Sequence, residues 1–182
     1  MFDVIRKDMP LKGYITTFEC KLDNSKMDKK IKKLIDEQGD RQNHKTNVKA
    51  NMTEWHMQDK PGFKTLSQII INMAKTISKE MYNREEQFRI LDMWGMKYKS
   101  GEYAIQHDHW PSVFSFVYYL NAPKNASGLF FAEMGEQGGV RQLEQGLLLC
   151  FPGNTRHEVK PSQFKGSRYV VSSNLDILRK KL

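Results

Sequence analysis

The second half of this 182-residue chain carries the pattern that most constrains its fold. From about residue 88, short runs rich in aromatic and β-branched residues alternate with segments rich in Gly, Pro, Asn and Ser. Such runs are typical of strands, and the segments between them are typical of turns. Many short strands at this spacing indicate an antiparallel sandwich or barrel. The runs are FRILDMWGMKY, EYAIQHDH, VFSFVYYL, GLFFAEM, GLLLCF, RHEVKP and SRYVVSSN.

The first half has a different pattern, and we expect it to be helix-rich with short strands. One predicted helix covers residues 28–35, and a longer one covers residues 63–81, where apolar residues recur every three or four positions. We expect the apolar face of the longer helix to pack on a sheet. The prediction is therefore a single α+β domain over residues 1–182. In it, a helix-rich part (1–87) buttresses a β-barrel core (88–178).

Composition limits the class of protein. Hydrophobic residues make up 39% of the chain and aromatic residues 11%, which is enough to build a core. No apolar run approaches the roughly 20 residues that span a bilayer, so we expect no membrane partner. The first residues lack the layout of a secretory signal, and a cytoplasmic protein is the expectation. Cys20 and Cys150 are expected to be free thiols.

The net charge of +8 raises nucleic acid as a partner. Much of the excess, however, comes from scattered lysines, five of which lie between residues 26 and 33. A solvated helix face accounts for these lysines equally well. Nucleic-acid binding therefore stays open but is not favoured.

Two histidines lie two positions apart in the run EYAIQHDHW. Residues i and i+2 of a strand face the same side, so His107 and His109 would point into one space and Asp108 would point away. The same alternation would place Tyr103 and Ile105 on the histidine face. His109 is therefore favoured over Asp108 as the second ligand of a metal.

A third histidine, His157, follows the strand GLLLCF and the turn PGNT. A strand–turn–strand connection can return it to the first pair, giving three ligands with open positions. Such a triad suits Fe(II) that must bind oxygen and a substrate, although neutral imidazoles accept zinc, copper or nickel equally well. The alternative is that these histidines are polar residues at the barrel mouth with satisfied hydrogen bonds.

The order of features from Trp94 to Asn174 resembles the Fe(II)/2-oxoglutarate-dependent dioxygenases, particularly the prolyl-hydroxylase-like and phage-encoded branch. Three elements carry this resemblance. An aromatic strand ending in YYLN follows the first histidine pair, and an FPG–His segment supplies the distal histidine. Finally, Arg168 follows His157 by eleven residues and begins the next strand.

The resemblance implies a double-stranded β-helix (jelly-roll) that binds Fe(II) through His107, His109 and His157. It implies a hydroxylase that uses O2 and 2-oxoglutarate, releases succinate and CO2, and takes ascorbate as a further cofactor. Arg168 would pair with the distal carboxylate of 2-oxoglutarate, because a guanidinium fork matches a carboxylate with two charge-assisted hydrogen bonds. A phage-encoded member would act in the host cytoplasm.

Further site residues follow from the resemblance together with strand alternation. Similarity to prolyl hydroxylases makes the hydroxyl of Tyr119 a contact of the same carboxylate, or alternatively a core aromatic. Ser172 and Asn174 share a strand face with Arg168. The expected cofactor-binding residues are thus Arg168, Tyr119, Tyr103 and Ser172, and the expected substrate contacts are Tyr98, Trp110 and Asn174.

The chain departs from the family pattern at one ligand. The usual triad is His-x-Asp/Glu with a distal His, whereas His109 stands at the carboxylate position and leaves the iron one unit more positive. Either the three histidines bind iron together, or His107 and His157 bind it with water or an anion at the third site. Two other functions stay open: a three-histidine iron dioxygenase that does not use 2-oxoglutarate, and a catalytically silent barrel that binds nucleic acid or protein. The substrate, a protein side chain such as proline or a small molecule, is not written in the sequence.

Overall fold

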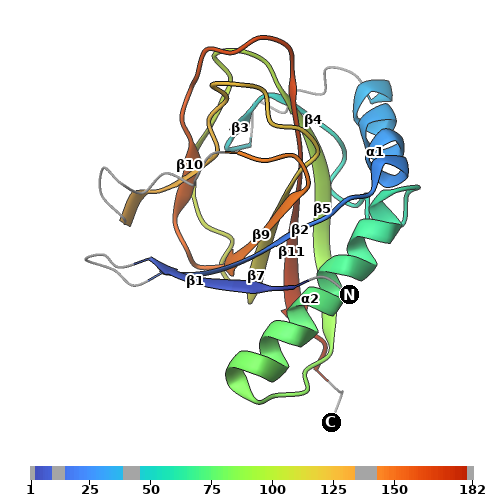
Figure 1. The fold of residues 1–182 in the computed structure, drawn as a ribbon, viewed down its shortest axis with the longest axis vertical. Coiled ribbons are helices and arrows are strands. Elements are labelled where there is room, and N and C mark those ends of the chain that lie inside the picture. Colours follow the sequence, from blue (N-terminus) through green and yellow to red (C-terminus); the bar gives the residue numbers. More distant parts are fainter. Residues whose placement is uncertain (1–2, 10–14, 39–45, 134–142, 180–182) are drawn as a thin grey trace.

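The computed structural model describes residues 3–9, 15–38, 46–133 and 143–179. The Gly-rich segment after the run GLFFAEM, at residues 135–139, lies outside the described residues, and so does the turn expected there. Within those ranges the chain forms two helices and eleven strands, an α+β arrangement (Figure 1). The helices are α1 (Ser25–Glu37) and α2 (Phe63–Tyr82). The strands are β1 (Ile5–Met9), β2 (Ile15–Lys21), β3 (Val48–Lys49), β4 (Asn51–Met52), β5 (Phe88–Tyr98), β6 (Tyr103–His107), β7 (Phe114–Tyr119), β8 (Leu129–Phe131), β9 (Leu147–Pro152), β10 (His157–Val159) and β11 (Arg168–Ile177).

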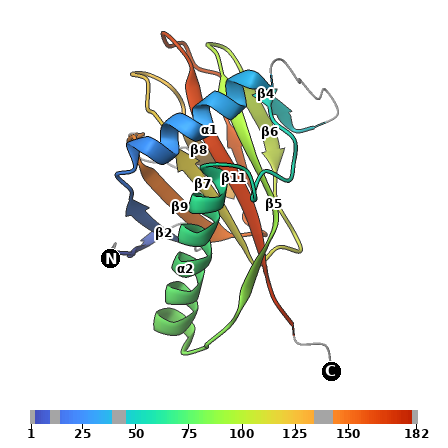
Figure 2. The ribbon, with the colours of Figure 1, turned by 90° about the vertical axis from the view of Figure 1, so that its right-hand side faces the viewer.

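The strands form two sheets. The larger has the order β1-β2-β9-β7-β11-β5-β4, and the smaller has the order β3-β6-β10-β8. Every pairing between these strands is antiparallel. The two helices lie along one face of the larger sheet (Figure 2). The smaller sheet lies against its other face, so the layers run helices, larger sheet, smaller sheet.

Alternation along the strands of the larger sheet supplies two separate cores. In β11, Val171 belongs to the core under the helices, whereas Val170 belongs to the core between the two sheets. In β7, Tyr118 and Tyr119 divide in the same way. Successive side chains of a strand point to opposite faces, so one strand can serve both cores. The functional residues described below lie in the core between the sheets.

The helices form near the predicted positions. The structure starts α1 three residues before the predicted start, because the side chain of Asn24 accepts a hydrogen bond from the backbone N–H of Met27 (3.0 Å) and caps the helix. The apolar face of α2 packs on the larger sheet, as predicted. Gly95 permits the close approach of α1 to the same sheet, since a Cβ there would lie 2.5 Å from Cγ1 of Ile35.

The first half contributes more strand than its sequence pattern indicates. β1 and β2 extend the larger sheet beyond β9, and β3 and β4 add one strand to each sheet. In the described ranges no helix has the length and apolar character required to cross a membrane. Cys20 and Cys150 are both free and buried, in agreement with the prediction.

Candidate metal centre and adjoining cavity

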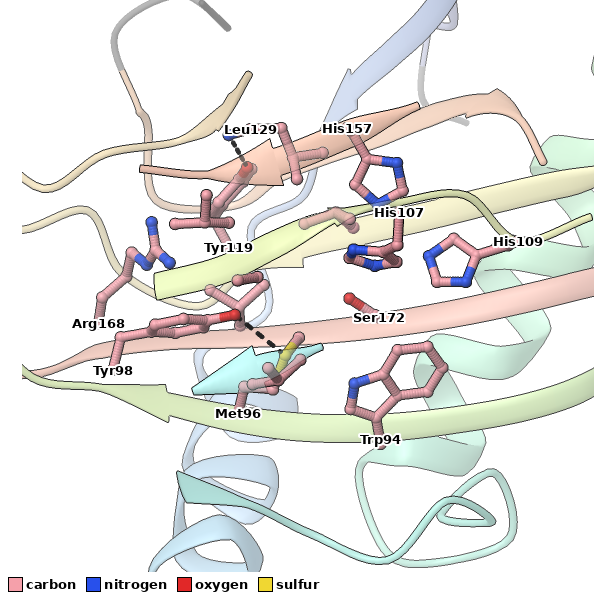
Figure 3. Close-up of a pocket in the computed structure, with 15 residues that line it drawn as sticks. Trp94, Met96, Tyr98, His107, His109, Tyr119, Leu129, His157, Arg168 and Ser172 are labelled. Atoms are coloured by element: carbon pink, nitrogen blue, oxygen red, sulfur yellow. Dashed lines mark hydrogen bonds between the residues drawn. The ribbon is translucent and has the colours of Figure 1, made fainter. Parts of the chain in front are cut away.

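Three histidines converge at one end of the space between the sheets (Figure 3). His107 ends β6 and His157 begins β10, and the two residues are directly opposite in the pairing of these strands. His109 follows two residues after β6 ends. One ring nitrogen from each histidine lies within 4.8 Å of the others. Ligands at about 2 Å from one ion are no more than about 4 Å apart, so a small inward movement of the rings would let the three nitrogens share a metal ion.

A bulge in β6 changes which of its residues face inward. His157 pairs with His107, but Val159 pairs with Ala104, so β6 has one extra residue over this stretch. Ala104 and His107 both line the cavity as a result. The side chains of Tyr103 and Ile105 are 39% and 46% exposed. The prediction that these two residues share the inward histidine face is therefore wrong, because it assumed unbroken alternation.

His109, and not Asp108, lies in the histidine cluster. Asp108 is exposed, and its carboxylate accepts a hydrogen bond from the backbone N–H of Trp110 (3.1 Å). The ring of His109 lies among the other two histidine rings, with centroids 5.0 Å from His107 and 5.1 Å from His157. Asp108 is not placed to bind a metal that the three histidines hold.

The backbone of Gly153 holds the segment that carries His109. The N–H of His109 donates to the carbonyl of Gly153 (2.7 Å), and the N–H of Ser112 donates to the carbonyl of His109 (2.8 Å). A Cβ on Gly153 would lie only 2.1 Å from the backbone oxygen of Ser112. Gly153 is thus the point where the FPG–His turn and the histidine-pair segment touch.

Replacing Gly153 with Ala is expected to lower Zn(II) affinity at least about tenfold and to destabilise the fold by about 1–3 kcal/mol. The added methyl group must push the residue 109–112 segment away, and His109 moves with it. Zn(II) titration and urea unfolding measure the two effects. Asn154→Ala, an exposed change in the same turn, is the matched control. Unchanged zinc affinity in Gly153→Ala would show that this contact does not position His109.

Backbone carbonyls set the ring tautomers of two histidines. Nδ1 of His107 lies 2.6 Å from the carbonyl oxygen of Ile105, and Nδ1 of His157 lies 2.9 Å from that of Thr155. A carbonyl oxygen can only accept, so each Nδ1 carries the hydrogen and each Nε2 keeps a free lone pair. This outer hydrogen bond is the one that metal-binding histidines ordinarily make.

The three rings are held in their neutral forms. Burial, together with the charges that His157 and His107 would carry, lowers the pKa of His109 to about 3. Burial and the neighbouring His107 lower the pKa of His157 to about 4. Burial also lowers the pKa of His107. Since a metal binds only the deprotonated nitrogen, the site is ready for a metal at neutral pH.

The opposite end of the cavity holds Arg168. This side chain is only 2% exposed, and its guanidinium carbon lies 4.2 Å from the centroid of the Tyr98 ring. Among the residues that the structure describes, no carboxylate lies within ion-pairing distance of Arg168, and its Nε has no hydrogen-bond partner. Arg168 is therefore a buried cation without a counter-ion in the described chain.

Two tyrosines lie beside this cation. The hydroxyl oxygen of Tyr119 accepts a hydrogen bond from the backbone N–H of Leu129 (3.3 Å), which leaves its own hydrogen for another acceptor. Burial raises the pKa of Tyr119 and raises that of Tyr98 to about 12. Both hydroxyls thus keep their hydrogens at neutral pH.

Trp94 adds a further unpartnered donor near the histidines. The side chain is 3% exposed, its Nε1 has no hydrogen-bond partner within the described part of the chain, and its ring centroid lies 6.0 Å from that of His109. The sequence marks it only as the start of the motif. Strand alternation could have predicted that Trp94 lines the cavity, because Trp94, Met96 and Tyr98 share one face of β5 and line the same cavity.

The cavity gathers most of the residues that the sequence singled out, as Figure 3 shows. Two predicted substrate contacts lie elsewhere: Trp110 is 76% exposed, and Asn174 is buried behind His109. Tyr103, a predicted cofactor contact, is outside the cavity. The residues that line the cavity are Val48, Trp94, Met96, Tyr98, Ala104, His107, His109, Val117, Tyr119, Leu129, His157, Val159, Arg168, Val170 and Ser172.

Comparison with known proteins identifies the fold. Neither the models of protein families nor the curated proteins gave a match. Matches were found among solved structures. The viral collagen prolyl hydroxylase of Paramecium bursaria Chlorella virus-1, in complex with 2-oxoglutarate, matches with a TM-score of 0.59 at 15% identity, over 86% of this chain and 94% of that one. The chain has the fold of the 2-oxoglutarate/Fe(II) oxygenases.

Two other structures with the oxygenase fold support the same conclusion. HygX from Streptomyces hygroscopicus, with nickel, 2-oxoglutarate and hygromycin B bound, has a TM-score of 0.64 at 8% identity, over 87% of this chain and 82% of that one. A prolyl-4-hydroxylase from Pseudomonas putida has a TM-score of 0.54 at 17% identity, over 74% of each chain. The resemblance carried by the stretch from Trp94 to Asn174 is thus confirmed for the fold.

Proposed function

We propose that this chain is a 2-oxoglutarate/Fe(II)-dependent oxygenase that hydroxylates a protein side chain, such as proline, or a small molecule, with release of succinate and CO2. One observation carries the proposal. A cavity between the two sheets has three neutral, convergent histidines at one end and a buried, unpaired arginine at the other. Such a cavity fits a ligand that binds a metal at one end and presents a carboxylate at the other.

The buried charge of Arg168 argues for an anionic ligand. Removing a cation from water costs several kcal/mol unless an anion or hydrogen-bond acceptors replace the water. The carboxylate of 2-oxoglutarate supplies both, and the guanidinium fork can bind its two oxygens. The hydroxyl of Tyr119 is a second donor to this carboxylate, and the ring of Tyr98 supports the guanidinium from one side.

At the other end, His107 and His157 would hold Fe(II), with His109 as the third ligand. Bound iron and 2-oxoglutarate would supply the oxygen activation that protein side chains lack. Three neutral ligands would leave the divalent ion uncompensated, so one carboxylate of the dianionic cosubstrate would offset one unit of the metal's charge and the other carboxylate would offset Arg168. The indole N–H of Trp94 is an additional donor for a ligand oxygen on the metal side.

The proposal also includes the architecture of the chain and one contact with the substrate. We propose that the two sheets form a double-stranded β-helix and that residues 1–182 make one domain. This is supported by the core that the helices share with the larger sheet. Trp110 lies outside the cavity but is 76% exposed and next to His109 in the sequence, and we propose that it contacts a substrate at the surface.

An anaerobic titration tests the function. Fe(II) is added to the metal-free protein, followed by 2-oxoglutarate, and the visible absorption band of the iron–2-oxoglutarate chelate is recorded. Oxygen is then admitted and succinate is measured. We expect saturable binding of both, followed by succinate release. Absence of 2-oxoglutarate binding by the iron-loaded protein would overturn the proposal.

Two other outcomes would indicate the rival functions. Oxygen consumption without succinate would favour a three-histidine dioxygenase that does not use 2-oxoglutarate. No metal binding, with folding unchanged in His107→Ala and His157→Ala, would favour a silent barrel that binds a macromolecule through its basic surface.

A further inference from the structure

The third histidine is held differently from the other two. Nδ1 of His109 faces the side-chain amide of Asn174, with 3.3 Å between Nδ1 and Nδ2. The same Nδ2 donates to the Oδ1 of Asp92 at 2.7 Å, while the Oδ1 of Asn174 accepts from the hydroxyl of Ser115 at 2.9 Å. Asn174 is only 5% exposed, so its side-chain amide depends on these contacts with the protein and not on water.

The carboxylate of Asp92 fixes the orientation of this amide. A carboxylate only accepts, so the NH2 group of Asn174 must face Asp92. The second hydrogen of that NH2 group then faces Nδ1 of His109, which has to act as the acceptor. A neutral imidazole whose Nδ1 accepts carries its hydrogen on Nε2. An Nε2 that carries a hydrogen has no free lone pair for a metal.

We propose that Asn174, oriented by Asp92, is a positioning residue that holds His109 in the Nε2–H tautomer, so that His109 becomes a metal ligand only when the Asn174 amide turns over. This proposal rests on the metal site of the proposed function and deepens it. His107 and His157 are the resident ligands, because their carbonyl partners fix the opposite tautomer.

Turning the amide over has one requirement. The amide oxygen would then face both Nδ1–H of His109 and Asp92. Asp92 must therefore be protonated, so that it can donate a hydrogen bond to this oxygen. The hydroxyl of Ser115 can donate or accept and therefore permits either orientation. The protonation state of Asp92 would therefore control the orientation of the amide. Asp92 also lines a surface hollow together with Glu54, Trp55 and His56.

The electrostatics of Asp92 fit such a role. Burial raises the pKa of Asp92, while the hydrogen bond from Asn174 and the nearby His56 act in the opposite direction. The protonated form of Asp92 is therefore easier to reach than that of an exposed aspartate. The position at which the oxygenase family has a carboxylate ligand is thus filled by a histidine that a remote carboxylate regulates.

Nitrogen NMR of the wild-type protein tests the first step. In 15N-labelled, metal-free protein near neutral pH, imidazole nitrogen shifts show which ring nitrogen carries the hydrogen. We expect the Nδ1–H form for His107 and His157 and the Nε2–H form for His109. Assignment comes from single His→Gln variants. Three rings in the Nδ1–H form would overturn the proposal, and this measurement needs no change at Asp92 or Asn174.

A swap of the two side chains tests the second step. The double variant Asp92→Asn/Asn174→Asp keeps the charge and the volume but places the carboxylate next to His109. We expect His109 to change to the Nδ1–H tautomer and Zn(II) affinity to rise about tenfold or more, as a carboxylate–histidine–metal arrangement does. A merely structural role would lower zinc affinity and leave the tautomer unchanged, and that result would contradict the proposal.

The controls separate this inference from the proposed function. Asp176→Asn removes a carboxylate from the same strand, one that pairs with Arg89 and not with Asn174, and should change neither the tautomer nor zinc affinity. All readouts use Zn(II) or no metal, and none uses 2-oxoglutarate. If the protein binds zinc as expected but does not bind 2-oxoglutarate, the proposed oxygenase function is wrong. The proposed role of Asn174 is not affected by that result.

Discussion

Arg168→Met is expected to weaken 2-oxoglutarate binding to the Fe(II)-loaded protein by about 30- to 4,000-fold. Removing one partner of a buried, hydrogen-bonded charge pair costs about 2–5 kcal/mol, which corresponds to that range. The anaerobic 2-oxoglutarate titration measures it. Metal affinity should stay the same, because Arg168 lies at the other end of the cavity from the histidines (Figure 3).

Two comparisons make this prediction specific. Arg168→Lys keeps the charge but loses the two-pronged geometry, so its 2-oxoglutarate affinity should lie between those of the wild type and Arg168→Met. The ligand-free Arg168→Met protein should be as stable as the wild type or more stable, because the unpaired buried charge is gone. An Arg168→Met protein that binds 2-oxoglutarate as tightly as the wild type would remove the arginine from the site.

Strand alternation predicted the face of β11 correctly and that of β6 only in part. β11 pairs with β5 and β7 in unbroken register from Val170 to Asn174, so the inward face of Arg168 and Ser172 could be read from the sequence. In β6 a bulge adds one residue before His107, which turns Tyr103 outward. Nothing in the sequence EYAIQH marks the bulge, because it arises from the pairing with β10.

Contacts between distant segments were outside the reach of the sequence. Asn174 contacts Asp92 and Ser115 because these residues are its partners in the register of β5 and β7. The sequence identified Asn174 as facing the site but gave it a substrate contact, since strand order and register were unknown. Trp94 was likewise recognised as part of the motif, while its position at the metal end depends on how β5 lies under the histidines.

The metal-free protein is expected to lose stability as the pH falls from 6.5 towards 4. The folded state lowers the pKa of His157 from 6.5 to about 4, so the unfolded chain takes up protons more readily. The contribution of neutral His157 to the free energy of unfolding is therefore complete above pH 6.5 and is lost progressively as the pH falls below it. This fall in pKa corresponds to about 3 kcal/mol for His157 alone, and His109, with a pKa of about 3, adds to it. Typical domains are stable by only 5–15 kcal/mol in total.

Urea unfolding at a series of pH values measures this loss. His157→Asn, which cannot titrate, should show a much shallower dependence on pH, whereas replacing the exposed His56 with Asn should not. Saturating Zn(II) should stabilise the protein most near neutral pH and progressively less in acid, because protons compete for the same nitrogens. A wild-type protein whose stability is flat down to pH 4 would show that the rings are hydrated. Desolvation would then no longer explain why the site stays neutral and free to bind a metal.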